Sequence, residues 1–149
     1  MANAVSVKIS GLDQVEQKLR ELPSKFVRKA LRNALRAGGR VLADEIRRGA
    51  ERYRRTGWLA SHIVVRLKLK SAEREGVALV GATRAQNPDH LGSNAAAELL
   101  WHEFGTKVHG KPHEPARPIV RPAFEAKKEA ALGAFVEKLR APFREVLGG

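Results

Sequence analysis

Residues 25–53 read KFVRKALRNALRAGGRVLADEIRRGAERY, and this stretch decides the fold. Its apolar side chains recur every three or four residues, which is the spacing of one face of an α-helix. The apolar stripe consists of Val27, Leu31, Leu35, Leu42, Ile46 and Tyr53. We therefore predict one long helix with Ser24 as its N-cap.

The predicted helix is long for its chain. At about 1.5 Å per residue it measures roughly 45 Å, whereas a compact domain of this chain length is about 40 Å across. We therefore expect the helix to protrude or to bend. Gly38 and Gly39 lie at its middle, and a glycine pair there marks a kink or a close contact.

The same helix carries most of the charge of the chain. Residues 25–55 contain eleven lysines and arginines and three acidic residues, in a sequence with a formal net charge of +12. Such a field attracts polyanions and steers association with acidic partners. A solvated helix face and a functional basic surface are both compatible with this pattern. The candidate basic face comprises Arg28, Lys29, Arg32, Arg36, Arg40 and Arg47.

Strand patterns lie on both sides of the helix. Residues 5–9 alternate polar and apolar side chains and predict a short first strand, and the spacing from Leu12 predicts a helix that Pro23 ends. Residues 62–70 and 77–80 predict the two strands of a hairpin.

The second half of the chain predicts a loop, a helix, an arm and another helix. Residues 82–94 are mostly polar and are expected to form a flexible loop, followed by a helix over 95–104. Four prolines in 111–122 disfavour a helix and favour an extended arm. Helical spacing returns from Ala123, and Pro142 is expected to bend or stop the last turn.

Enzyme chemistry has weak support. His102-Glu103 begins like a zinc-protease helix, but Thr106 occupies the place of the second histidine. Ser61 and His62 are neighbours in a predicted strand, whose successive side chains point to opposite faces. The sequence has no cysteine, and we find no signal peptide or membrane-spanning stretch. We expect no enzymatic activity, no cofactor, no metal and no membrane contact.

Two tryptophans, Trp58 and Trp101, each lie close to a glycine in the sequence. Each could belong to the hydrophobic core at the edge of the sheet. Each could instead anchor a subunit interface, where tryptophan is enriched.

Four segments occur in an order that is specific to a known family. They are VSVKISGL at 5–12, RTGWL at 55–59, WHEFGT at 101–106 and PARPIVRPAF at 115–124. With the basic helix between them, they make the chain closely resemble the tail-completion, or head–tail connector, family of long-tailed double-stranded DNA bacteriophages, prophages and gene-transfer particles. The resemblance covers nearly the whole chain.

The resemblance implies an α+β fold in one domain over residues 1–149, with a small antiparallel sheet packed against a long N-terminal helix and a C-terminal helix. It implies a homo-oligomeric, six-fold ring in the virion neck, made in the bacterial host cytoplasm. Its partners would be head-connector or stopper proteins and the tail-tube or tail-terminator protein, with non-specific contact to passing DNA. A free-standing nucleic-acid-binding module is the alternative, and a small nuclease or toxin is a weaker one.

Three of these segments supply the expected subunit or partner contacts. We expect the turns at 103–106 and 115–118, which are the most specific parts of the resemblance, to brace the sheet and present its edge to neighbours. These contact residues are Thr56, Gly57, Trp58, Leu59, Trp101, His102, Glu103, Phe104, Gly105, Thr106, Pro115, Ala116, Arg117, Pro118, Arg121 and Pro122.

Overall fold

The computed structural model describes residues 22–53, 57–70, 75–88 and 92–147. Their elements are α2 (Ser24–Glu51), α3 (Trp58–Ser61), β1 (Ile63–Leu69), β2 (Gly76–Ala82), α4 (Ala95–Phe104), β3 (Thr106–Val108), β4 (Lys111–Glu114) and α5 (Val120–Leu147). The predicted α+β fold class is confirmed. The predicted strand at 5–9 and almost all of the predicted helix at 12–22 lie outside the described residues.

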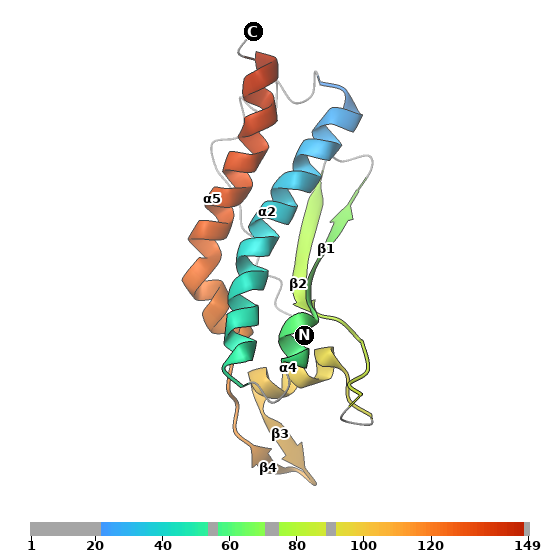
Figure 1. The fold of residues 1–149 in the computed structure, drawn as a ribbon, viewed down its shortest axis with the longest axis vertical. Coiled ribbons are helices and arrows are strands. Elements are labelled where there is room, and N and C mark those ends of the chain that lie inside the picture. Colours follow the sequence, from blue (N-terminus) through green and yellow to red (C-terminus); the bar gives the residue numbers. More distant parts are fainter. Residues whose placement is uncertain (1–21, 54–56, 71–74, 89–91, 148–149) are drawn as a thin grey trace.

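Helix α2 lies between two layers, with α5 on one side and the β1–β2 ribbon on the other (Figure 1). The predicted long helix is confirmed. Both α2 and α5 contain 28 residues, which corresponds to about 42 Å each. Because α5 runs beside α2 along its length, the molecule is elongated and the long helix is covered by its own chain (Figure 1).

Small residues form much of the buried face of α2. Ala30, Ala34 and Gly38 are buried at four-residue spacing, whereas Leu31 and Leu35 of the predicted stripe are only half-buried. Small side chains on one helix let another helix approach closely. A Cβ added to Gly38 would lie 2.9 Å from the carbonyl oxygen of Ala131 on α5. Of the two predicted roles for the glycine pair, the close contact is therefore confirmed.

The start of α2 differs from the prediction. Ser24 is the first helical residue and not the N-cap, which is Pro23. The carbonyl oxygen of Pro23 accepts hydrogen bonds from the backbone N–H groups of Phe26 and Val27, at 2.9 and 3.2 Å. Proline is stable in the extended conformation seen here, with φ of −54° and ψ of 131°, and so can close the first turn through its backbone alone.

The predicted β1–β2 hairpin is confirmed. The strands are antiparallel, and their register pairs Ile63 with Ala82 and Leu69 with Gly76. One face of the ribbon packs on α2, where a Cβ at Gly39 would lie 2.6 Å from Val65 Cγ1. Toward the C-terminal end of α2, this helix shares one core with α3, the start of β1, α4 and the start of α5. Its buried members are Ala43, Ile46, Ala50, Leu59, Ala60, Ile63, Ala95, Leu99, Ile119 and Ala123.

The region predicted as an extended arm contains a second hairpin. Strands β3 and β4 pair through a turn at His109 and Gly110, which both have positive φ. Glycine adopts that conformation readily, and histidine is among the residues enriched there. Pro112 is tolerated because a two-stranded ribbon has only edge strands. The hairpin projects from one end of the molecule (Figure 1).

The bounds of α5 correct two further predictions. The helix begins at Val120, so the arm ends before Pro122, which lies in the first helical turn. A proline costs little there, because the first N–H groups of a helix have no intrahelical partner. Pro142 does not stop the helix, which continues to Leu147. The carbonyl that loses its partner belongs to Lys138, which is exposed and can bind water instead.

Within the described ranges, no helix is both long and apolar enough to span a bilayer. Residues 82–94 are described over 82–88 and 92–94. Both parts are hydrogen-bonded: the N–H of Asn87 donates to the carbonyl of Ser93, and the N–H of Ala96 donates to that of Thr83. The flexibility of this segment and the single-domain organisation stay predictions.

Candidate assembly interface

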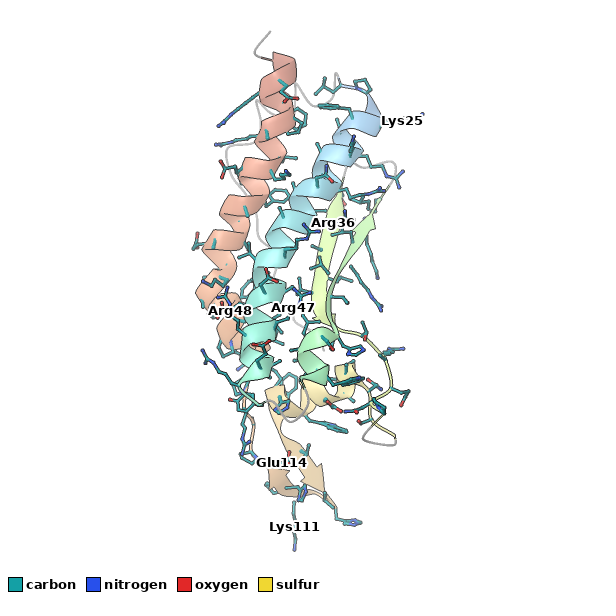
Figure 2. All side chains as sticks on the ribbon, viewed as in Figure 1. Lys25, Arg36, Arg47, Arg48, Lys111 and Glu114 are labelled. Carbon is teal, nitrogen blue, oxygen red and sulfur yellow. The ribbon has the colours of Figure 1, made fainter. Side chains whose placement is uncertain are left out.

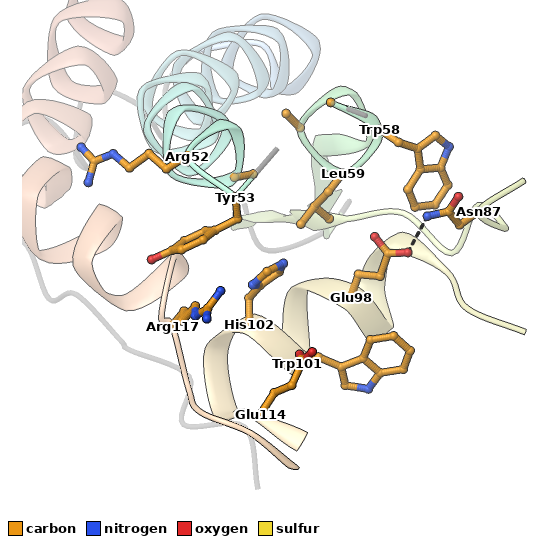
Figure 3. Close-up of a pocket in the computed structure, with 13 residues that line it drawn as sticks. Arg52, Tyr53, Trp58, Leu59, Asn87, Glu98, Trp101, His102, Glu114 and Arg117 are labelled. Atoms are coloured by element: carbon orange, nitrogen blue, oxygen red, sulfur yellow. Dashed lines mark hydrogen bonds between the residues drawn. The ribbon is translucent and has the colours of Figure 1, made fainter. Parts of the chain in front are cut away.

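A cleft of about 490 Å³ opens at the end of the molecule where α2, α3, α4 and β4 meet (Figure 3). It brings together residues from all three of the contact segments that the sequence singled out. The predicted contact residues in its wall are Gly57, Trp58, Leu59, Trp101, His102 and Arg117. Other lining residues that the sequence did not suggest as contacts are Ala50, Arg52, Tyr53, Ala60, Asn87, Glu98 and Glu114.

Tyr53, His102 and Arg117 form a stack on one side of the cleft (Figure 3). The rings of Tyr53 and His102 are stacked with centroids 5.2 Å apart, and the guanidinium carbon of Arg117 lies 5.9 Å from the Tyr53 centroid. Burial lowers the pKa of His102 below 6.5, against the opposite influence of the nearby carboxylates of Glu114 and Glu98. The imidazole is therefore neutral at pH 7.

Glu98 fixes the opposite side of the cleft. One of its carboxylate oxygens, Oε1, accepts hydrogen bonds from Asn87 Nδ2 at 2.6 Å and from Ser93 Oγ at 2.9 Å (Figure 3 shows the first of these). Asn87 and Ser93 are both buried. Buried polar side chains are stable when paired in this way. The carboxylate thus holds the described ends of the 82–94 segment against α4.

The base of the β3–β4 hairpin is clamped by a glutamate of α4. Glu103 accepts hydrogen bonds from the first N–H groups of α5: Oε2 lies 2.9 Å from the nitrogens of both Ile119 and Val120, and Oε1 lies 3.2 Å from that of Arg121. A carboxylate at a helix N-terminus satisfies unpaired donors and opposes the positive end of the helix dipole. The sequence assigned Glu103 to a partner contact, and the structure gives it this internal role.

Two backbone features complete the clamp. The N–H of Arg117 donates to the carbonyl of His102 at 2.7 Å. Gly105 has φ of 74° and ψ of 178°, and a Cβ there would lie 2.6 Å from the carbonyl oxygen of Glu114. Only glycine tolerates both conditions. The turns at 103–106 and 115–118 therefore brace the second hairpin and the start of α5, and not the β1–β2 sheet as expected.

Large apolar side chains remain exposed around this end. They are Tyr53 (39% exposed), Leu100 (56%), Trp101 (46%), Phe104 (67%) and Val108 (49%). The two tryptophans thus differ. Trp58 is half-buried and packs against the core, with its ring 4.3 Å from that of His62, whereas Trp101 is a surface residue.

The remaining predicted contact residues lie in or near the hairpin base. Pro115, Ala116 and Pro118 are exposed on the segment that leads into α5, and Arg121 and Pro122 are exposed in its first turn. The hydroxyl of Thr106 is buried and has no hydrogen-bond partner among the described residues. Thr56 lies outside the described residues. Their part in partner contacts stays a prediction.

The comparison with known families agrees with the resemblance. Residues 13–100 match the model of the family described as "Bacteriophage HK97-gp10, putative tail-component". The chain belongs to this family. The HK97-gp10-like protein is therefore a bacteriophage tail component, a structural protein of the virion. No curated protein and no solved structure matches the chain.

The basic face of this HK97-gp10-like protein divides into two groups. Arg47 bonds within the fold, since its guanidinium donates to Asp44 Oδ1 at 2.6 Å and to the carbonyl of Ile63 at 2.7 Å. The other five predicted residues of the face are exposed: Arg28, Lys29, Arg32, Arg36 and Arg40. Figure 2 shows Lys25 and Arg36 on the half of α2 that is distant from the β3–β4 hairpin.

The same structure bears on metal binding and on nucleophilic catalysis. Within the described ranges, no group of three or more His, Cys, Asp or Glu residues could hold a metal ion. Ser61 ends α3 and His62 follows it, so they are not strand neighbours as predicted. Their side chains do approach, with Ser61 Oγ 3.1 Å from His62 Nδ1.

Proposed function

We propose that this tail component forms a homo-oligomeric, hexameric ring in the virion neck, joins the head connector to the tail tube and surrounds the passing DNA. The observation that supports this most is the group of exposed apolar side chains at the cleft end of the molecule, where three of the four family segments meet. We call this group the apolar band: Tyr53, Leu100, Trp101, Phe104 and Val108. Exposed apolar surface of this kind commonly marks a protein–protein contact. The band defines the proposed subunit interface.

The size of the band favours a closed ring over an isolated dimer. Full burial of a large apolar side chain contributes about 1.5–3 kcal/mol, so half-exposed side chains contribute about 1 kcal/mol each, or roughly 5 kcal/mol for the five in the band. Association costs about 4–15 kcal/mol in lost freedom. One such contact is therefore weak. In a closed ring each subunit makes two such contacts, and ring closure combines the binding strength of both.

The β3–β4 hairpin is suited to reach a neighbour. Its residues from Lys107 to Glu114 are exposed, and it projects beyond the helices while its base is held by Glu103 and Gly105 (Figure 1). A rigidly anchored arm loses little conformational entropy on binding. In the proposed ring, this hairpin and the apolar band of one subunit contact the adjacent subunit or the next ring of the neck.

The interface is tested with Phe104→Asp, which places a charge in the band. Val77→Asp is the matched control, because Val77 is 54% exposed on β2 near the other end of the molecule. Native mass spectrometry, alone and with a tail-tube extract, measures assembly. We expect Phe104→Asp to abolish oligomers and the joining of heads to tails in complementation, and Val77→Asp to retain both. Equal assembly by the two variants would reject the proposed interface.

We also propose that the role is structural and not catalytic. Among the described residues, the nearest arrangement of a nucleophile and a base is Ser61 with His62, and both side chains contact one acceptor. Ser61 Oγ lies 2.7 Å and His62 Nδ1 2.8 Å from the carbonyl oxygen of Trp58. A carbonyl only accepts, so a hydrogen bond to it requires the tautomer with a proton on Nδ1, and in that tautomer Nδ1 cannot take a proton from the serine. Turnover of any substrate by the purified chain would contradict this proposal.

A free-standing nucleic-acid-binding module is the second candidate, and the exposed cations of α2 favour it. It differs from the ring in its assembly: the module stays a monomer in the presence of tail-tube extract, and virions that lack it still join heads to tails. The mass measurement and the complementation assay therefore separate the two functions.

A further inference from the structure

The charges of α2 are distributed unevenly along the helix. Residues 24–43 contain six basic side chains and no acidic one, and the first carboxylate is that of Asp44. In the lower part of the helix the arginines are paired, Arg47 with Asp44 at 2.6 Å and Arg48 with Glu45 at 2.9 Å. Among the described residues, no ion pair involves residues 24–43, so helix stability does not explain the basic charge there.

The unpaired cations oppose helix formation. The N-terminus of a helix is the positive end of its dipole, so a cation in the first turn, here Lys25, is unfavourable. Like charges four residues apart on a helix also repel each other and destabilise it. Arg28, Arg32, Arg36 and Arg40 have that spacing, and the first turn of α2 has no acidic residue. A bound polyanion would neutralise this repulsion between the arginines.

Three of these arginines line a groove with strand β1. The groove is about 600 Å³ in volume and is bounded by Arg28, Arg32 and Arg36 on α2 and by Val65, Leu67, Lys68 and Leu69 on β1. Within the part of the chain that the structure describes, none of the three arginines forms a hydrogen bond or an ion pair. Their guanidinium groups are free to bind an external anion.

The spacing of the three arginines suits a regular row of anions. Residues four apart on a helix are displaced by about 6 Å along its axis, close to the rise of about 6.8 Å over two nucleotides of one B-DNA strand. Guanidinium groups bind phosphate through two parallel hydrogen bonds. Val65, Leu67 and Leu69 are already half-buried in the fold, so a protein partner would gain little apolar contact in the groove.

We propose that the groove between α2 and β1 binds the phosphate backbone of double-stranded DNA through Arg28, Arg32, Arg36 and Lys68. The inference rests on the proposed function, because a neck ring is where such a chain meets the genome. Backbone contacts carry no sequence information, so binding is non-specific. We expect dissociation constants of about 10⁻⁴–10⁻⁶ M at physiological salt, which permit DNA to pass.

Fluorescence anisotropy of a random-sequence DNA duplex tests the proposal. Four phosphate contacts give a slope of about −3.6 in log K against log salt, or a roughly 150-fold loss of affinity from 50 to 200 mM salt. The triple variant Arg28→Gln, Arg32→Gln, Arg36→Gln should reduce the magnitude of that slope by about 2.7. The control removes the same charge from exposed residues of α5: Lys138→Gln, Arg140→Gln and Arg144→Gln. It should leave the slope unchanged.

Equal loss in the two triple variants would overturn the proposal, since it would mean that only net charge matters. Unchanged DNA binding with lost binding to poly-L-glutamate would also overturn it, and would identify a surface for an acidic protein. Native mass spectrometry measures assembly separately. The triple variant Arg28→Gln, Arg32→Gln, Arg36→Gln should form oligomers of wild-type mass. Phe104→Asp should keep the wild-type salt slope of DNA binding. These measurements therefore distinguish failure of the DNA-binding proposal from failure of the ring proposal.

Discussion

Replacing Glu103 by alanine tests how the hairpin base is held. The substitution removes three hydrogen bonds to the start of α5, from the nitrogens of Ile119, Val120 and Arg121. Loss of a helix cap costs about 1–2 kcal/mol, and loss of a carboxylate at the positive helix end about 0.3–1 kcal/mol. Ile119 is buried, so water cannot readily replace the lost acceptor there. We expect Glu103→Ala to lower the free energy of unfolding by about 2–3 kcal/mol.

Urea unfolding followed by tryptophan fluorescence measures this change. With a slope of about 2 kcal/mol per molar urea, the midpoint should fall by about 1 M. Glu103→Gln retains one acceptor oxygen and should show an intermediate loss. Glu137→Ala, which removes an exposed glutamate of α5, is the control. If Glu103→Ala unfolds at the same urea concentration as this control, the carboxylate does not cap α5 and the argument for a clamped hairpin is wrong.

Two further predictions concern the helix contact and the cleft. Gly38→Ala should destabilise the protein because its Cβ would meet the Ala131 carbonyl at 2.9 Å, whereas Gly133→Ala on α5, with nothing within 4 Å, should stabilise it by about 1 kcal/mol; thermal melts of both variants check the sign. Because the pKa of His102 is lower in the fold than 6.5, the unfolded chain binds more protons below that pH, so stability should decrease as the pH falls from 6.5. Urea midpoints from pH 7.5 to 5 should show a smaller decrease in His102→Gln, and an equal decrease would contradict the assignment.

Local patterns in the sequence predicted most elements well. The helix over 25–53, the β1–β2 hairpin and the helix over 95–104 all have repeats that depend on side chains two to four residues apart. The second hairpin was missed because the four prolines in 111–122 favoured an extended arm, and the signal that could have found it is the His109-Gly110 turn. Pro142 was expected to bend or stop the last turn, and it does not stop the helix because an exposed carbonyl can exchange a helix bond for water.

The sequence predicted which segments form the candidate site, but it did not predict what the individual residues do there. The sequence selected three of the segments that meet at the cleft, including Trp58, Trp101 and Arg117. It assigned Tyr53 to the apolar stripe of the helix, whereas Tyr53 is 39% exposed and stacks on His102. That contact joins residues 49 positions apart, and no local pattern encodes such a distance.

The sequence by itself determined the periodic helices, the strand alternation, the excess of basic residues in the first half of α2 and the family to which the chain belongs. These properties depend on near neighbours or on composition. Only the tertiary structure decided that Gly38 faces Ala131, that Glu103 caps α5, and that Arg28, Arg32 and Arg36 line a groove with β1 while Arg47 does not. Each of these depends on which distant segments pack together, because a side chain acquires its partner only when the fold brings that partner within a few ångströms.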